Sequence, residues 1–158
     1  MATGTPATTL LTKSGIDFVV HEYQHDPNAA SFGLEAATKL GIEPERVFKT
    51  LIAAVDTGFA VAIVPVNQQV SLKALSRALN AKKATMADPS QASRMSGYVV
   101  GGISPLGQKK LLPTIIDESA QLFDRILVSG GRRGFDIELS PTDLANLLSA
   151  KFFDIGTD

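Results

Sequence analysis

Apolar and polar residues alternate along the chain in short blocks, so the pattern predicts short strands and short helices in mixed order. Period-two alternation or short apolar runs predict strands near residues 16–20, 47–55, 59–66, 98–100, 112–116, 125–128 and 135–139. Apolar residues at helical spacing predict helices near residues 6–14, 33–40, 72–79, 89–96 and 141–148. We therefore expect roughly six to eight strands and five or six short helices.

The ends of several predicted helices carry residues that favour helix termini. Ser31 and Ser140 are candidate N-caps, and Pro141 suits the first helical position. Gly41 and Gly97 are candidate stops, because glycine readily adopts the left-handed conformation that ends many helices. These signals place the helix boundaries more firmly than the apolar spacing does.

The order of the elements favours an α+β fold. Residues 56–58, with the sequence Asp-Thr-Gly, predict a hairpin between two apolar strands, and strands do not alternate regularly with helices. Several strands look apolar on both faces, which predicts a sheet curled around its own core. We therefore expect a single domain over residues 1–158, built as a curled, largely antiparallel mixed sheet, barrel-like and surrounded by short helices.

Composition narrows the classes of function. The chain has 158 residues, 44% hydrophobic content and a net charge of −1, which is typical of a globular protein. It contains no cysteine, which excludes disulfides, thiolate metal sites and a cysteine nucleophile, and which fits a reducing compartment. Residues 1–11 lack the pattern of a signal peptide, and the longest apolar region, residues 51–66, is interrupted and too short to cross a membrane. We expect a cytoplasmic protein without a membrane partner.

The usual signatures of metal and nucleotide sites are missing from the sequence. Its two histidines, His21 and His25, have acidic neighbours but no clear third ligand, so they do not predict a metal site. Neither the Walker-type phosphate loop nor the Gly-x-Gly-x-x-Gly dinucleotide fingerprint occurs. We therefore expect no metal and no cofactor.

Two glycine-rich, basic segments each follow a predicted strand. Residues 101–110 read Gly-Gly-Ile-Ser-Pro-Leu-Gly-Gln-Lys-Lys, and residues 129–134 read Ser-Gly-Gly-Arg-Arg-Gly. Glycines let bare backbone N–H groups approach a ligand, and nearby lysine and arginine suit an anion such as phosphate. One hypothesis is a single binding surface built from both segments. Two tight turns with solvated charges fit the composition equally well.

Lys49 lies in an otherwise apolar strand, on the face predicted for Leu51, Ala53 and Val55. Such a lysine must reach solvent, pair with an acid or point into a pocket, and the pattern by itself slightly favours solvent. Inside a pocket it would offer a fixed positive charge to a carbonyl or phosphate oxygen.

Two acids and two aromatic residues are further candidates. Asp136 and Glu138 share the polar face of the strand predicted at 135–139. Asp136 could accept a hydrogen bond from a ligand amine, whereas we interpret Glu138 as an exposed residue. Tyr23 and Phe32 flank a polar segment and could wall a small pocket, although most such aromatic residues belong to a core.

Four segments together resemble the YbaK/EbsC family, whose members are free-standing relatives of the editing domain inserted in prolyl-tRNA synthetases. The segments are Phe-Lys-Thr-Leu at 48–51, Met-Ala-Asp-Pro at 86–89, the glycine-rich stretch at 97–110 and Ser-Gly-Gly-Arg-Arg-Gly at 129–134. The likeness extends from about residue 21 to residue 152, and the combination is specific although no single motif is. It departs at Phe135, where the family pattern has leucine.

The resemblance implies a trans-editing hydrolase that cleaves the ester between a wrong amino acid and the terminal ribose of tRNA(Pro), with Cys-tRNA(Pro) as the expected substrate. One alternative is removal of another small amino acid, such as alanine. Others are a non-catalytic adaptor for tRNA or a synthetase, and a module that binds nucleotides or phosphate. The expected partners are the acceptor end of mischarged tRNA(Pro) and prolyl-tRNA synthetase.

The resemblance also implies roles for residues in the matching motifs. Lys49 and the backbone N–H groups around Gly101 and Gly102 would be the catalytic groups, steadying the oxyanion of an ester that is already activated. The expected substrate-binding residues are Tyr23, Phe32, Thr50, Ser129 and Asp136, and the basic pairs supply the candidate tRNA contacts Lys109, Lys110, Arg132 and Arg133. Because the chain has no cysteine, an attacking thiol would have to come from the substrate.

Overall fold

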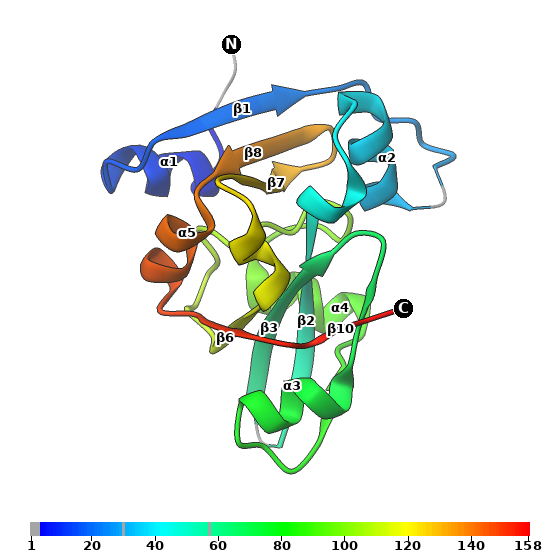
Figure 1. Cartoon of the computed structure of the whole chain (residues 1–158), viewed down its shortest axis with the longest axis vertical. Helices are drawn as coiled ribbons and strands as arrows, with labels where there is room; N and C mark the ends of the chain where they lie inside the picture. The colour runs from blue at the N-terminus through cyan, green and yellow to red at the C-terminus, as the bar shows by residue number, and fades with distance from the viewer. Residues whose placement is uncertain (1–3, 30, 57) are drawn as a thin grey trace.

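The computed structural model describes residues 4–29, 31–56 and 58–158, and Figure 1 shows how the elements are arranged. The α-helices are α1 (Pro6–Lys13), α2 (Phe32–Leu40), α3 (Leu72–Ala78), α4 (Pro89–Ser96) and α5 (Pro141–Leu148). Two short 3-10 helices are η1 (Pro44–Arg46) and η2 (Glu118–Leu122). The strands are β1 (Phe18–Glu22), β2 (Phe48–Val55), β3 (Gly58–Pro65), β4 (Gln69–Val70), β5 (Ala84–Met86), β6 (Thr114–Asp117), β7 (Ile126–Arg132), β8 (Phe135–Leu139), β9 (Lys151–Phe153) and β10 (Gly156–Thr157). This mixture of helices and strands confirms the predicted α+β class.

The strands of the described residues form three sheets rather than one curled sheet. The largest has the order β5-β2-β3-β6-β9, antiparallel from β5 to β3 and parallel from β3 to β9. A second, antiparallel sheet has the order β1-β8-β7, and β10 pairs with β4. None of these sheets closes on itself, so the prediction of a barrel-like sheet is wrong.

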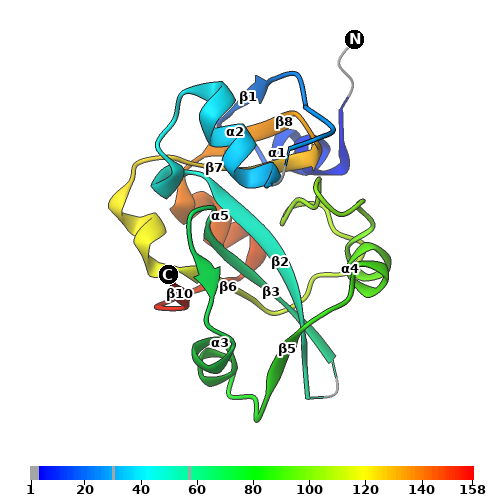
Figure 2. The same cartoon turned by 90° about the vertical axis from the view of Figure 1, so that its right-hand side faces the viewer.

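Separate layers cover the two faces of the β2–β3 hairpin, which explains why its strands are apolar on both faces. On one face, Ile52 and Ile63 share a core with Ile137 of the antiparallel sheet. On the other face, Val64 packs with Leu75 of α3. Figure 2 shows the antiparallel sheet at the upper end of the hairpin and α3 beside its lower half. An apolar strand needs cover on both faces, and packed layers provide it without any curling.

The helix termini match the predicted capping residues. The side chains of Ser31 and Ser140 accept hydrogen bonds from backbone N–H groups in the first turns of α2 and α5. Gly41 and Gly97 follow α2 and α4 in the left-handed conformation, with φ of 69° and 84°. Local sequence chemistry therefore fixes where these helices begin and end. No helix in the described ranges is long and apolar enough to cross a membrane.

One predicted strand and one predicted loop differ from the structure. Residues 98–100 lie in irregular chain after α4, because Tyr98 is buried and its hydroxyl group donates to the Leu106 carbonyl within the same loop. The segment at 129–134 is mostly strand, since β7 continues to Arg132 with a shift of register after Ser129. Strands β4, β5, β9 and β10 were not predicted, because two or three residues are too few for a period to show. Thr57, in the predicted hairpin connection, lies outside the described residues.

Glu138 is not the exposed residue that the alternation predicted. Its side chain is 19% exposed, and its carboxylate oxygens lie 2.6 Å from His21 Nε2 and 3.1 Å from Arg46 Nη2. Arg46 also donates to the Arg125 carbonyl. These contacts tie β1 and β8 to η1, so a polar network covers part of the sheet face that Glu138 shares with Asp136.

Candidate functional site

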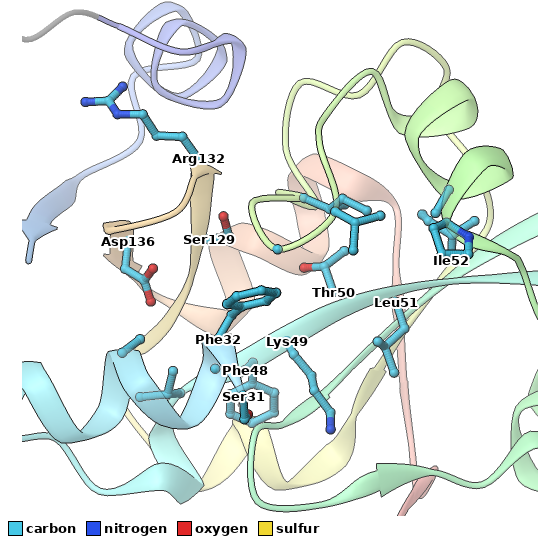
Figure 3. Close-up of a pocket in the computed structure, with 18 of the residues that line it drawn as sticks. Ser31, Phe32, Phe48, Lys49, Thr50, Leu51, Ile52, Ser129, Arg132 and Asp136 are labelled. Atoms are coloured by element: carbon cyan, nitrogen blue, oxygen red, sulfur yellow. The ribbon is translucent and has the colours of Figure 1, made fainter. Parts of the chain in front are cut away.

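Four segments that are far apart in the sequence enclose a cavity of about 320 Å³. They are the region around the start of α2, the first part of β2, the stretch from β5 through the loop after α4, and the β7–β8 hairpin. Figure 3 shows side chains from these segments around the cavity. The predicted site residues that line it are Tyr23, Phe32, Lys49, Thr50, Gly101, Ser129, Arg132 and Asp136. The predicted residues Gly102, Lys109, Lys110 and Arg133 lie outside the lining.

The cavity borders the first half of β2, where one edge of this strand lacks a partner strand within the described chain. β2 pairs with β3 along residues 48–55 but with β5 only along residues 53–55. Lys49 and Thr50 lie on this open edge, and strand alternation directs their side chains to opposite sides. Figure 3 shows the Thr50 hydroxyl group turned toward Ser129, while the Lys49 amine extends the other way.

Thr50 offers the cavity a hydrogen-bonding group that the protein itself does not use. Its Oγ1 atom is buried and has no hydrogen-bond partner among the described residues. Leaving a buried hydroxyl group unpaired costs about 1–3 kcal/mol, so such groups commonly serve a ligand or an ordered water. Thr50 is therefore a strong candidate for a polar contact to bound substrate.

Lys49 lines the cavity but does not aim its charge at the other polar groups in this conformation. The side chain is partly buried, and desolvation lowers the pKa of its amine from the ordinary value. It forms no ion pair with any described residue. In Figure 3 the amine points away from Ser129 and Asp136. The side chain would have to change its conformation to bring the charge to them.

Ser129 and Asp136 face one another across the β7–β8 ladder, so their side chains lie on the same face of the sheet. The Asp136 carboxyl group points toward the cavity in Figure 3. Asp136 is 6% exposed, and its burial raises the pKa of the carboxyl group to about 7. Burial, and then the nearby charge of Asp136, raise the pKa of Tyr23 to about 12. The sequence predicted the position of Asp136 but not its burial.

The glycine pair after α4 approaches the β7–β8 turn closely. Gly101 has φ of 96°, and a Cβ atom there would overlap Arg133. A Cβ atom on Gly102 would lie 2.7 Å from Arg132 Cα. The Gly102 N–H donates to the Val99 carbonyl at 2.9 Å, so it is already satisfied within the loop. This bond engages the Gly102 N–H, whereas no described group accepts a hydrogen bond from the Gly101 N–H.

Arg132 and Arg133, at the β7–β8 turn, contact different aromatic rings. The Arg132 guanidinium lies 4.1 Å from the centre of the Phe135 ring and 3.8 Å from the Glu22 carboxylate, and Figure 3 shows it pointing away from the cavity. The Arg133 guanidinium lies 4.1 Å from the centre of the Phe32 ring. Both guanidinium groups therefore have partners within the protein.

The lysines predicted to contact tRNA lie away from the cavity. The aliphatic part of Lys109 lies against Gly97 at the end of α4. Lys110 lines a second, open hollow near Asp56 and Phe59. The basic residues therefore do not gather into one patch around the cavity.

Sequence reasoning missed a hydrogen bond that joins two segments at one cavity wall. His25 Nδ1 lies 2.8 Å from Glu35, which also accepts a hydrogen bond of 2.6 Å from the Asp26 backbone. Burial would raise the pKa of Glu35, but these hydrogen bonds and the charge of Lys39 outweigh it and lower the pKa. The pair ties the chain before α2 to the helix, with the rings of His25 and Phe32 5.6 Å apart. A histidine ten residues before a glutamate is too ordinary a signal to reveal this contact.

The chemistry of the cavity suits binding and polarising a small ester. Apolar side chains such as Phe48, Ile52 and Met86 form much of its wall, and the polar groups come from the residues described above. Neither His21 nor His25 lines it, so no histidine base serves a nucleophile there. Among the described residues, no three histidine, aspartate or glutamate side chains are grouped as a metal site requires.

Comparison with known proteins places the chain in a family. The family model of the aminoacyl-tRNA editing domain matches residues 26–147, well over half of the chain. The chain belongs to the YbaK/EbsC family of aminoacyl-tRNA editing domains. An editing domain of this family acts on tRNA that carries an amino acid, so the expectation of a tRNA substrate is confirmed at this level.

Relatives show both free-standing and embedded forms of this editing domain. A protein of Enterococcus faecalis named “Putative Cys-tRNA(Pro)/Cys-tRNA(Cys) deacylase EbsC” is 43% identical over 122 residues, which cover 77% of this chain and 74% of that protein. A proline–tRNA ligase of Thermosipho melanesiensis is 25% identical over 114 residues, which cover 72% of this chain and 20% of the ligase. The crystal structure of a “putative trans-editing enzyme for prolyl tRNA synthetase” superposes with a TM-score of 0.84 at 21% identity, covering 99% of this chain and 100% of that one. It has the same fold.

Proposed function

We propose that this chain is a trans-editing deacylase that hydrolyses the ester of Cys-tRNA(Pro). The observation that carries the proposal is the cavity in which Thr50, Gly101, Ser129 and Asp136 come together with apolar walls. Family membership supports the reaction class, and the Enterococcus faecalis relative, named for Cys-tRNA deacylation, supports cysteine as the amino acid. A cavity of about 320 Å³ can hold an amino acid together with part of a ribose.

The groups at the cavity wall match the charges of an aminoacyl ester. Above pH 7 the Asp136 carboxylate can hold the α-ammonium group of the amino acid, and Ser129 beside it can hydrogen-bond a ribose hydroxyl group. The Thr50 hydroxyl group and the Gly101 N–H can donate to the ester carbonyl oxygen, whose charge grows in the transition state. Donors held in place before the reaction need no reorganisation as that charge appears.

Lys49 takes its role when substrate binds. Its long side chain lines the cavity and has no competing ion pair in the described part of the chain. A phosphate or an ester oxygen at the cavity mouth would attract the ammonium group. The charge would then add to the stabilisation of the oxyanion.

The substrate supplies the nucleophile in this proposal. The chain has no cysteine, and no histidine lines the cavity. The thiol of the cysteinyl ester attacks its own carbonyl carbon, the carbon–oxygen bond to ribose breaks, and the ribose oxygen leaves with the proton from the thiol. Water then opens the resulting thiolactone and gives free cysteine. Alanyl ester lacks the thiol and would have to react with water directly.

Deacylation of tRNA(Pro) charged with cysteine, alanine or proline tests the proposal. The wild-type protein should release cysteine fastest, and Lys49→Ala should abolish turnover while its unfolding midpoint stays near that of the wild type. Lys49→Arg keeps the charge but changes its shape, and it separates the need for charge from the need for an amine. Fastest release of alanine would favour the alternative substrate, and saturable tRNA binding without any ester loss would favour a non-catalytic adaptor.

Prolyl-tRNA synthetase is the proposed partner that holds the tRNA body. The chain has a net charge of −1, and its basic pairs do not surround the cavity. Affinity from phosphate contacts grows with the number of cations offered, so free tRNA should bind weakly. Adding the synthetase should lower the KM for charged tRNA with little change in kcat.

A further inference from the structure

We infer that Arg133 is a positioning residue that fixes the peptide between Val100 and Gly101, and thereby aims the Gly101 N–H at bound ester. The inference rests on the proposed deacylase function. It assigns to Arg133 a role at the site rather than the contact with tRNA that its charge suggested. Three observations carry it: the stack on Phe32, the hydrogen bond to Val100 and the close approach to Gly101.

The first step of the argument concerns the carbonyl group of Val100. Arg133 Nη2 donates to the Val100 oxygen at 3.1 Å. The peptide unit is planar and trans, so its C=O and N–H point in opposite directions. Val100 and Gly101 both line the cavity, whereas Arg133 lies outside the lining. Holding the carbonyl toward Arg133 therefore turns the Gly101 N–H away from Arg133 and toward the cavity side.

The second step concerns why the peptide between Val100 and Gly101 needs a restraint on its orientation. Gly101 has φ of 96°, a region that glycine enters freely and leaves freely, so the preceding peptide could flip at little cost. No acceptor among the described residues takes the Gly101 N–H, so nothing on the donor side fixes it. The hydrogen bond from the guanidinium group supplies this restraint on the carbonyl side. A cation at that oxygen also polarises the peptide and makes its N–H a stronger donor.

The third step concerns what holds Arg133 itself. Its guanidinium plane lies 4.1 Å from the centre of the Phe32 ring, at the start of α2. The same side chain therefore joins a cavity wall from α2, the loop after α4 and the β7–β8 turn. A Cβ atom on Gly101 would overlap Arg133 Nε, so a larger residue there would displace the guanidinium group. Arg132, the adjacent residue, stacks on Phe135 instead and reaches neither Phe32 nor Val100.

The test compares kcat and KM for Arg133→Ala, Arg133→Lys and Arg77→Ala on Cys-tRNA(Pro). Arg77 is an exposed arginine on α3, so its variant controls for the loss of one positive charge. We expect Arg133→Ala to lower kcat about tenfold with KM within about twofold, less than the roughly hundredfold loss when an oxyanion donor is removed outright. Arg133→Lys should recover little, because lysine cannot stack and donate in the same plane. Arg77→Ala should match the wild type.

Chemical rescue distinguishes positioning from a structural role. Arg133 is exposed, so free guanidinium ion can reach the gap left in Arg133→Ala. Guanidinium chloride well below denaturing concentration should restore most of the lost kcat, and sodium chloride at the same ionic strength should not. Unchanged kcat in Arg133→Ala would overturn the inference. So would a rise in KM alone, because that result would make Arg133 a contact for the tRNA.

A measurement without substrate keeps the inference separate from the proposed function. The NMR resonances of the Val100 carbonyl carbon and the Gly101 amide should shift in Arg133→Ala and stay in place in Arg77→Ala. If these resonances do not move, the inference fails whatever the protein hydrolyses. If they move but the wild type cleaves no aminoacyl ester, the peptide is positioned as inferred and the deacylase proposal fails.

Discussion

Replacing Asp136 by asparagine should make the protein more stable at neutral and alkaline pH. The side chain is 6% exposed, and burial raises the pKa of its carboxyl group from the ordinary 3.8 to about 7. The native state therefore binds a proton more tightly than the unfolded state does. The favourable contribution of the neutral carboxyl group is complete below pH 3.8 and is lost progressively as the pH rises to about 7.

The size of the effect follows from the pKa difference. A difference of roughly three pH units at 1.36 kcal/mol each amounts to about 4 kcal/mol above pH 7. At pH 5 less than half of this loss has occurred. An asparagine side chain cannot ionise and keeps nearly the same shape as aspartate. The unfolding free energy of Asp136→Asn should therefore exceed that of the wild type by about 4 kcal/mol at pH 8 and by much less at pH 5.

Urea unfolding at pH 5, 6, 7 and 8 measures this difference. The exposed Asp154 provides the control, because Asp154→Asn removes a carboxylate that has solvent around it. Its unfolding free energy should follow that of the wild type across the series. If Asp136→Asn and the wild type gave parallel curves, the carboxyl group would not be desolvated and the proposed role in holding an ammonium group would lose its basis. Asp136→Asn should also lose most deacylation, because a neutral amide cannot balance the substrate charge.

Three further variants probe other parts of the site. Thr50→Val replaces an unpaired buried hydroxyl group by a methyl group of similar size. The unfolding free energy should stay equal or rise by up to about 1 kcal/mol, while kcat falls. A fall in the unfolding free energy would contradict the absence of a hydrogen-bond partner for the Thr50 hydroxyl group. Gly101→Ala should lower the unfolding free energy by about 1–3 kcal/mol and lower activity, because its φ of 96° is strained for alanine; an unchanged thermal midpoint would refute the close approach. Glu35→Gln weakens the contact with His25 and should raise the KM for charged tRNA by loosening the wall that carries Phe32; equal KM values would show that the pair does not position this wall.

Local chemistry in the sequence predicted the helix ends, and the family resemblance predicted several of the residues that line the cavity. Ser31 and Ser140 cap helices because their side chains reach backbone groups a few residues away, which a short window of sequence contains. Lys49, Thr50, Gly101 and Asp136 were placed through motif resemblance, and all four line the same cavity.

Contacts between distant segments could not be predicted from the sequence. The alternation in residues 135–139 correctly separated two faces, but the exposure that it suggested for Glu138 was wrong, and it gave no sign that Asp136 is buried. Both residues are shielded by segments more than a hundred positions earlier in the chain, such as the partner of Glu138 at His21. The direction of the Lys49 side chain also depends on which edge of β2 is left open, and a strand pattern carries no information on that point.

The way the cavity is assembled limits how this activity could be moved from one protein to another. Its walls span residues 23 to 136, so no peptide cut from the chain carries a usable fragment of it. Transfer must take the folded unit whole, as an insertion whose two ends rejoin a host. The ligase from Thermosipho melanesiensis is an example of such an arrangement, because it matches 72% of this chain within 20% of its own length.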